Sequence, residues 1–309
     1  MRSSRRRKRL VERGRLSDAL KLPIVFLFKK QLSYALPLSL YFLVAIVATY
    51  PLTLRATDHV FGTGTPMLNS WAMAWVNHQL PQDPWHLFDG NVFYPYSRTL
   101  AFSEHLLAPA LMASPWIAVT GNAILAYNIV ALLTLTLAGL GMYFFCRELT
   151  GSPFPSFVGG LLYAFNTWNI NELSRIQILS NQWFPFLLWA LVRYFANPTP
   201  KRGFVVGLFC ALQALSCMYW ALYLPFVMLP ALVVLQWRHD LRWRKFLWLG
   251  SSLAGAVLLT APVAVPYIQN SGAFGFERDP PNPVPIDRYL QVNRGKHSLR
   301  KLARNRSTQ

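Results

Sequence analysis

Long apolar runs separated by polar segments dominate this sequence. Residues 31–54 contain no charged side chain over 24 positions, and about 20 apolar residues let a helix cross the hydrocarbon core of a bilayer. Residues 122–146 and 246–268 are further runs of this kind. Residues 154–170 and 178–195 are shorter apolar runs around a polar tip. Each of these five runs is predicted to be a membrane-spanning helix.

A sixth apolar run, residues 203–237, is too long for one crossing and has basic residues at both ends. We expect it to form a helical hairpin that turns near Met218 and Tyr219, which brings the number of spans to seven. The fold class is therefore all-α, a polytopic membrane protein. Basic residues flank membrane helices preferentially on the cytoplasmic side. This rule predicts a cytoplasmic N-terminus and an external loop over residues 55–105.

The predicted external loop is the most polar internal segment of the chain. Within it, Met67, Leu68, Trp71, Ala74 and Trp75 recur at helical spacing. This pattern is typical of a short helix that lies in the membrane interface with its tryptophans toward the lipid. The apolar run that follows, residues 106–120, is 15 residues long. It predicts a juxtamembrane or re-entrant helix, because a full crossing there would turn every later basic cluster outward.

Composition supports a membrane protein, since 53% of the residues are hydrophobic and 14% are charged. The net charge of +18 is concentrated at the two ends, with +9 in residues 1–30 and +5 in residues 277–309. Such a distribution argues against a nucleic-acid-binding face and favours contact with anionic membrane lipid. We expect a basic cytoplasmic N-terminus over residues 1–31, a membrane domain over 32–278 and a multi-pass location in the cell inner (plasma) membrane.

Residues 279–309 form a second basic segment, rich in proline near its start. With seven spans this segment would lie outside, against the positive-inside rule. Its composition is typical of an unstructured tail. We expect the reading frame or the domain to be interrupted near residue 279.

Candidate chemistry is confined to the external loop and the polar tip. Asp58, Glu104 and His105 bring carboxylates and an imidazole near a membrane surface, where a carboxylate could act as a general base or hold a divalent cation. The alternative is that these side chains cap short helices. Arg175 and Arg98 are suited to a phosphate, because guanidinium binds phosphate oxygens bidentately. The alternative for Arg175 is an ion pair with Glu172 at i, i+3.

Several short motifs carry a resemblance to a known family. They are Pro-Met-Leu-Asn-Ser-Trp at 66–71, Asn-Val-Phe-Tyr-Pro-Tyr at 91–96, Leu-Ala-Phe-Ser-Glu-His at 100–105, Leu-Ala-Tyr-Asn at 125–128 and Gln-Ile-Leu-Ser-Asn-Gln-Trp at 177–183. Together with the order of spans and loops, they resemble the GT-C superfamily of integral-membrane glycosyltransferases. More narrowly, the chain is similar to bacterial polyprenyl-phosphate-mannose-type mannosyltransferase-like proteins over residues 32–278.

The resemblance implies transfer of a sugar from a polyprenyl-phosphate carrier on the outer membrane face. An Asp or Glu of the first external loop would be the base or, in some members, a ligand of a divalent cation, which here means Glu104 or Asp58. Arg175 or Arg98 would contact the phosphate. His105, Asn69, Trp71 and Gln182 lie in or beside the motifs and are further candidates for substrate binding.

Two other interpretations remain open. Thr65 stands where related proteins tend to have an acidic residue, and such proteins usually continue with further helices. The chain could therefore be a truncated, inactive member of the family. It could also be a non-catalytic scaffold or a subunit that translocates lipid-linked sugar. An enzyme should lose function when the external carboxylates are changed, whereas a scaffold should tolerate those changes.

Overall fold

The computed structural model describes residues 35–239 and 243–274, and every regular element in these ranges is helical. The chain divides into two compact units, Met1–Asn270 and Ser271–Gln309. The predicted basic segments 1–31 and 279–309 lie outside the described residues.

A first helix covers Ala35–Ala48 and leads into the polar loop. The loop and the segment after it contain η1 (Leu52–Arg55), α2 (Thr65–Gln79), η2 (Pro84–His86), η3 (Thr99–Phe102) and α3 (Leu107–Thr120). The middle of the chain forms α4 (Ala123–Thr150), α5 (Pro153–Ala164), α6 (Thr167–Asn171), η4 (Glu172–Ser174) and α7 (Ile176–Leu179). The remaining helices are α8 (Trp183–Ala196), α9 (Pro200–Ala214), α10 (Met218–His239) and α11 (Trp243–Phe274).

Three of the described helices are long and apolar enough to cross a membrane. They are Ala123–Thr150, Met218–Arg238 within α10 and Phe246–Ala273 within α11. Only 6% of the most apolar stretch of α10, and of α11, is buried inside the protein. Large exposed apolar faces need a lipid or protein partner, so by length, composition and exposure these are the helices of a membrane protein.

Other predicted spans form shorter helices than the hydropathy pattern suggested. The first described helix ends at Ala48 rather than near residue 54, just before Pro51, which has no N–H for a helical hydrogen bond. The run 154–170 yields α5, with 12 residues, and the run 178–195 yields α8, with 14 residues. At about 1.5 Å per residue, both are shorter than the hydrocarbon core. The seven-span count therefore stays a prediction.

The turn predicted inside residues 203–237 is confirmed, because α9 ends at Ala214 and α10 begins at Met218. The short helix predicted after the loop is confirmed as α3, with 14 residues. The helix predicted within the loop is present as α2, but its buried face carries Asn69, Ala72, Met73 and Val76. This face packs against protein, so contact of α2 with a membrane interface stays a prediction.

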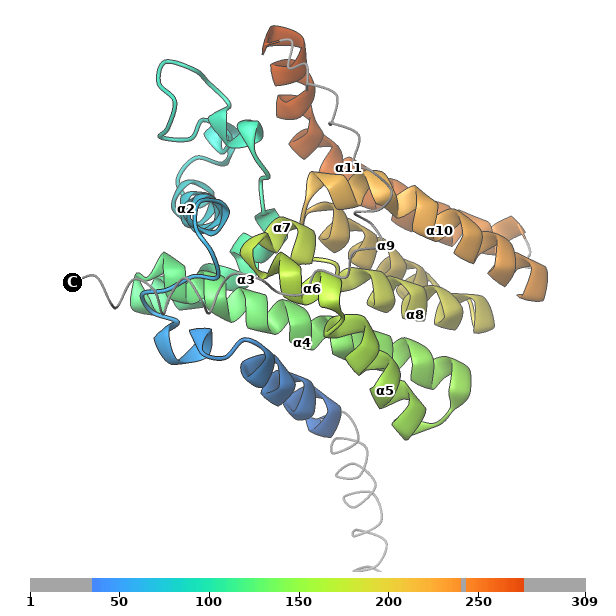
Figure 1. Cartoon of the computed structure of the whole chain (residues 1–309). Helices are drawn as coiled ribbons and strands as arrows, with labels where there is room; N and C mark the ends of the chain where they lie inside the picture. The colour runs from blue at the N-terminus through green and yellow to red at the C-terminus, as the bar shows by residue number, and fades with distance from the viewer. Residues whose placement is uncertain (1–34, 240–242, 275–309) are drawn as a thin grey trace, which may run out of the picture. The chain divides into compact units, whose positions relative to one another are not determined.

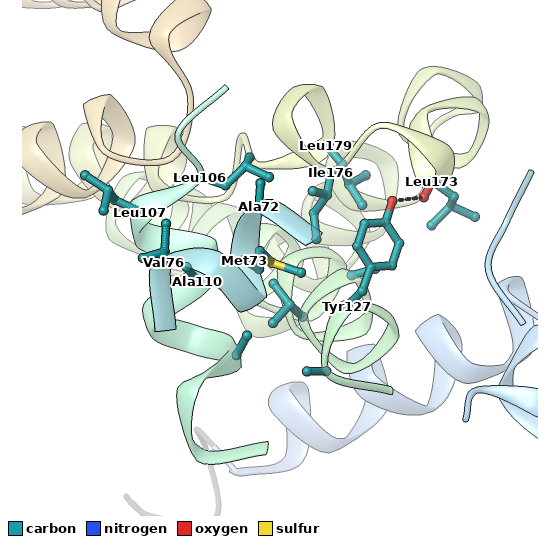
Figure 2. Close-up of a cluster of buried hydrophobic side chains, with 14 of the residues drawn as sticks. Ala72, Met73, Val76, Leu106, Leu107, Ala110, Tyr127, Leu173, Ile176 and Leu179 are labelled. Carbon is teal, nitrogen blue, oxygen red and sulfur yellow. Dashed lines mark hydrogen bonds between the residues drawn. The ribbon is translucent and has the colours of Figure 1, made fainter. Parts of the chain in front are cut away.

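A hydrophobic core forms where α2, α3, α4 and α7 meet (Figure 2). Met73 and Val76 of α2 lie beside Leu106, at the start of α3, in this cluster. The Tyr127 hydroxyl of α4 donates a hydrogen bond of 3.1 Å to the Leu173 carbonyl, which ties the polar tip to the same core. A second cluster joins α8 and α9 to α10 and α11. Figure 1 shows α4 running alongside α5 and α8.

Glycines allow several of these helices to approach closely. A Cβ atom at Gly139 of α4 or at Gly160 of α5 would collide with the Tyr41 ring or hydroxyl. The Tyr41 hydroxyl donates a hydrogen bond of 2.9 Å to the Phe157 carbonyl of α5. In α9, a Cβ atom at Gly207 would lie 2.5 Å from the Ser252 carbonyl oxygen of α11. Small residues at helix contacts are characteristic of membrane helix packing, because backbones must come close to gain van der Waals contact.

Candidate functional site

Glu104 is a buried carboxyl group that contacts the start of a distant helix. It lies between η3 and α3, and its Oε2 atom accepts a hydrogen bond of 2.7 Å from the backbone N–H of Met218, the first residue of α10. Helix N-termini carry unpaired N–H groups and partial positive charge, which favours a carboxylate there. Burial raises the pKa of Glu104, and this effect outweighs the lowering by the Met218 hydrogen bond. The contact is that of a helix cap supplied from a remote segment.

His105 is completely buried beside Glu104. Its Nδ1 atom accepts a hydrogen bond of 3.1 Å from the Leu107 backbone N–H, and its Nε2 atom has no partner among the described residues. Burial lowers the pKa of His105 to about 3, so the imidazole is neutral at physiological pH. Tyr267 of α11 meets this ring edge-on at 6.2 Å and donates a hydrogen bond of 2.9 Å to the Ser103 carbonyl.

Asp58 lies on an exposed turn after η1. Its carboxylate oxygens lie 3.0 Å from the His59 imidazole and 3.0 Å from the Arg55 guanidinium. The hydrogen bond from His59, and then that from Arg55, hold the pKa of Asp58 below its usual range. Asp58 is therefore ionised at neutral pH, and about half of its side chain is exposed.

The Asp58 turn is fixed by two asparagines of the α4 region. The Asn122 side chain donates a hydrogen bond of 2.9 Å to the Thr57 carbonyl. The Asn128 side chain donates to the carbonyls of Ala56 and His59, at 2.8 and 2.7 Å. An exposed carboxylate is thus held on a backbone that is anchored to the longest helix of the core.

The two candidate arginines differ in what surrounds them. Arg175 forms an ion pair with Glu172, with nitrogen–oxygen distances of 2.8 and 3.1 Å, which is the i, i+3 pair considered from the sequence. The Arg98 guanidinium donates a hydrogen bond of 2.8 Å to the neutral side chain of Gln269 in α11. No carboxylate of the described residues lies within ion-pair distance of it.

Asn69 and Trp71 of α2 have contacts within the protein. The Asn69 side chain is buried and donates a hydrogen bond of 2.6 Å to the Gln177 side chain of α7. The Trp71 indole N–H donates a hydrogen bond of 2.9 Å to the Asn91 side chain. The two residues therefore tie α2 to α7 and to the loop.

Gln182 belongs to a buried polar turn between α7 and α8. Its Oε1 atom has no partner among the described residues, and the same is true of the Ser180 hydroxyl and the Asn181 Oδ1 atom. Gln213 of α9 braces this turn, since its side chain donates to the Ser180 carbonyl at 2.7 Å and accepts from the Trp183 N–H at 3.2 Å. The turn is polar but enclosed by helices.

The structure brings together some of the predicted residues. Glu104, His105 and Arg98 lie on one loop segment, and their contacts reach the start of α10 and the far part of α11. Asp58 and Arg175 have charged partners within three residues of themselves. The sequence-predicted residues are thus spread over the loop junction, two exposed positions, helix α2 and the buried turn before α8.

The described residues offer no preformed metal site of three or more protein ligands. No cluster of three or more His, Cys, Asp or Glu side chains with metal-binding geometry occurs in residues 35–239 and 243–274. Asp58 and His59 supply two donors at most, and both are engaged with each other.

Sequence reasoning missed the amides that organise the site. Asn122 and Asn128 position the Asp58 turn, and Gln213 braces the buried polar turn. A single amide side chain inside an apolar run is the sequence feature that could have identified them, because a polar group in a membrane helix is expected to have a hydrogen-bond partner.

Comparison with known proteins gave no match. No protein-family model, no curated protein and no solved structure matches this chain. The resemblance to membrane glycosyltransferases rests on the sequence motifs and on the order of helices and loops.

Proposed function

We propose that this chain is a GT-C-like membrane glycosyltransferase that takes a sugar from a polyprenyl-phosphate carrier. In this proposal the protein lies in the inner (plasma) membrane with seven spans, its N-terminus is cytoplasmic, and the loop 55–105 faces outward. The sequence motifs, the all-helical fold and the three long apolar helices support this assignment.

The exposed carboxylate of Asp58 is the observation that carries the proposal. It lies on the turn after η1, is ionised and about half exposed, contacts Arg55 and His59, and is anchored to α4. Glu104, in contrast, is buried and committed to the N-terminus of α10. We therefore assign the base to Asp58 and a positioning role to Glu104, which holds the loop against α10.

The proposed reaction is a direct displacement at the anomeric carbon of the sugar. The acceptor hydroxyl oxygen forms a bond to this carbon as its proton passes to the Asp58 carboxylate. The bond between the anomeric carbon and the phosphate oxygen breaks, and its electron pair leaves with the polyprenyl phosphate. Arg98 is the better candidate for contact with this leaving group, because the Arg175 guanidinium is already paired with Glu172.

Two matched substitutions test the assignment. The full chain, purified in detergent, would be assayed for sugar transfer from a radiolabelled polyprenyl-phosphate sugar. Asp58→Asn should reduce the rate about 100-fold or more, as loss of a general base usually does, and should leave the melting temperature unchanged. Glu104→Gln keeps an acceptor for Met218, so it should retain most activity. Loss of activity in Glu104→Gln, with full activity in Asp58→Asn, would contradict the assignment.

A second candidate function is a non-catalytic scaffold or translocation subunit for lipid-linked sugar. The observation that favours it is that Glu104 and Arg175 already have internal partners. Such a protein would bind the polyprenyl-phosphate sugar without releasing polyprenyl phosphate. Binding that persists in Asp58→Asn, combined with no turnover in the wild-type protein, would favour this second function.

A further inference from the structure

A cavity of about 530 Å³ lies between the C-terminal parts of α4 and α8. Its lining residues are Phe144, Arg147, Glu148, Gly151, Trp189 and Arg193. None of them belongs to the site described above. The cavity is mixed in character, with two guanidinium groups, one carboxylate and two aromatic side chains.

The two arginines of this cavity are positioned by aromatic neighbours. The Arg147 guanidinium donates a hydrogen bond of 3.0 Å to the Tyr143 hydroxyl and lies 5.8 Å from the centre of the same ring. The Arg193 guanidinium lies 5.0 Å over the Trp189 ring. Stacking on aromatic rings holds a guanidinium in place and leaves its N–H groups directed outward in the ring plane.

Glu148 compensates these charges incompletely. Its nearest contact with Arg193 is 3.8 Å, which is longer than a hydrogen bond. Two arginines face one carboxylate, so the cavity carries a formal charge of +1. The Arg193 side chain is about 41% exposed and can therefore be reached by a ligand.

A third arginine extends the positive charge along α8 and α9. Arg202 donates hydrogen bonds to the carbonyls of Arg193 and Asn197, at 2.8 and 3.0 Å. It lines an adjoining cavity of about 150 Å³ that shares Trp189 and Arg193 with the first. Arg202 thereby pairs with carbonyls at the end of α8, where helix geometry leaves them free.

We propose that this cavity binds an anionic phosphate group, with the headgroup of an anionic membrane lipid or free phosphate as its source. Guanidinium groups bind phosphate oxygens through paired, charge-assisted hydrogen bonds, and basic pockets between membrane helices bind anionic lipid headgroups. Phe144 and Trp189 give the cavity an apolar wall for the carbon chain of a lipid.

This site lies far from the Asp58 turn. Asn122, which anchors that turn, and Arg147 are separated by about 37 Å along α4, at 1.5 Å per residue. The hydrocarbon core of a bilayer is about 30 Å thick. With α4 as a membrane span, as proposed above, the two sites lie on opposite membrane faces, and the phosphate site does not depend on the proposed sugar transfer.

Direct binding measurements test the proposal. The purified full chain in an uncharged detergent would be titrated with short-chain phosphatidylglycerol, with phosphatidylcholine or with inorganic phosphate, and Kd measured by thermophoresis. Phosphatidylglycerol should bind more tightly than phosphatidylcholine, whose phosphate charge is balanced by choline. If inorganic phosphate competes with phosphatidylglycerol for binding, free phosphate is a sufficient ligand. If inorganic phosphate does not compete, the site requires the lipid headgroup.

Matched variants locate the binding. The double variant Arg147→Gln/Arg193→Gln should weaken phosphatidylglycerol binding about tenfold or more, because both guanidinium forks are lost. Arg238→Gln removes one positive charge from an exposed position on α10, so it should change Kd less than about twofold and less than Arg147→Gln or Arg193→Gln alone. If the double variant fails to fold, Arg147→Lys/Arg193→Lys keeps the charge and should bind more weakly than the wild type. Equal binding of both lipids by the wild type, or equal loss in Arg238→Gln, would overturn the proposal.

Discussion

The two ends of α4 use polar side chains in opposite ways. At the N-terminal end, Asn122 and Asn128 make short hydrogen bonds to backbone carbonyls of the loop. At the C-terminal end, Arg147 and Arg193 line a cavity, and the contact of Arg193 with Glu148 is loose. The amides at the N-terminal end hold the loop on α4. The arginines at the C-terminal end line a cavity instead.

Some polar side chains hold segments of the protein together, and others are exposed to a ligand. Their contacts and exposure distinguish these two roles better than their residue types do. Glu104, a natural candidate for a base, belongs with the structural groups because its buried side chain accepts the hydrogen bond of the Met218 N–H at the start of α10. Asp58 lies on a turn fixed by those groups, but its own carboxylate is exposed. Variants of the anchoring groups should therefore lose more stability than variants of Arg147 or of the exposed Asp58 turn.

Removal of the Glu104 carboxyl should destabilise the protein most. Glu104→Ala leaves the Met218 N–H without its acceptor, and loss of a hydrogen bond to a charged group costs about 1.5–3 kcal/mol. Thermal unfolding of the purified protein, followed by tryptophan fluorescence, would measure it. Arg147→Gln, near the C-terminal end of α4, changes a side chain that lines the cavity and should unfold close to the wild type. Equal melting temperatures for Glu104→Ala and wild type would refute the capping role.

Asn128→Leu should have a somewhat smaller effect. It removes the donor for two carbonyls, those of Ala56 and His59, and a typical intramolecular hydrogen bond contributes about 0.5–1.5 kcal/mol. Limited proteolysis should then cut near Asp58 faster than in the wild type. If the cleavage rate in this turn stays the same, the anchoring role of Asn128 is wrong.

Some of this architecture could be predicted from the sequence. The runs at 122–146 and 246–268 and the turn inside 203–237 follow from hydropathy, because lipid demands long uninterrupted apolar helices. The pairing of Arg175 with Glu172 also follows from local i, i+3 spacing. These features depend on residues that are neighbours in the chain.

The remainder depends on contacts that no local pattern encodes. Glu104 and Met218 are 114 positions apart, so hydropathy and spacing say nothing about their hydrogen bond. Helix α5 is shorter than its apolar run because Asn166 caps a new helix, α6. Helix α8 is shorter than its run because a polar but buried turn precedes Trp183. A window of mean hydropathy does not distinguish a buried polar turn from a continuous span.

The acid sensitivity of the loop junction gives a third prediction. His105 has a pKa of about 3 when folded, because of burial, and about 6.5 when unfolded. The unfolded chain binds the additional proton between these values, so this residue's contribution to stability is lost as pH falls below about 6.5. The loss is about 1.4 kcal/mol per pH unit. His105→Gln should show a shallower fall of melting temperature with pH, and an unchanged slope would contradict this.

The smallest effect is expected for the exposed Asp58 turn. Arg55→Gln breaks a surface ion pair that is largely solvated, and such pairs contribute little to stability. Its melting temperature should match that of the wild type. A clear decrease would mean that the Asp58 turn is held by its charges and would weaken the contrast with the anchoring amides.

The hydrogen bond between the Tyr41 hydroxyl and the Phe157 carbonyl affects the order in which the helices pack during synthesis. Its two partners are 116 positions apart, and at about 5–20 residues per second a ribosome needs about 6 to 23 s to make the intervening chain. During that interval the first helix has been made, but the Phe157 carbonyl has not. The contact surface for the Tyr41 ring is also incomplete, because it includes glycines of both α4 and α5. The first helix therefore cannot form this contact until α5 has been made. Until then, the Tyr41 hydroxyl must form its hydrogen bond with water, lipid headgroups or the insertion machinery.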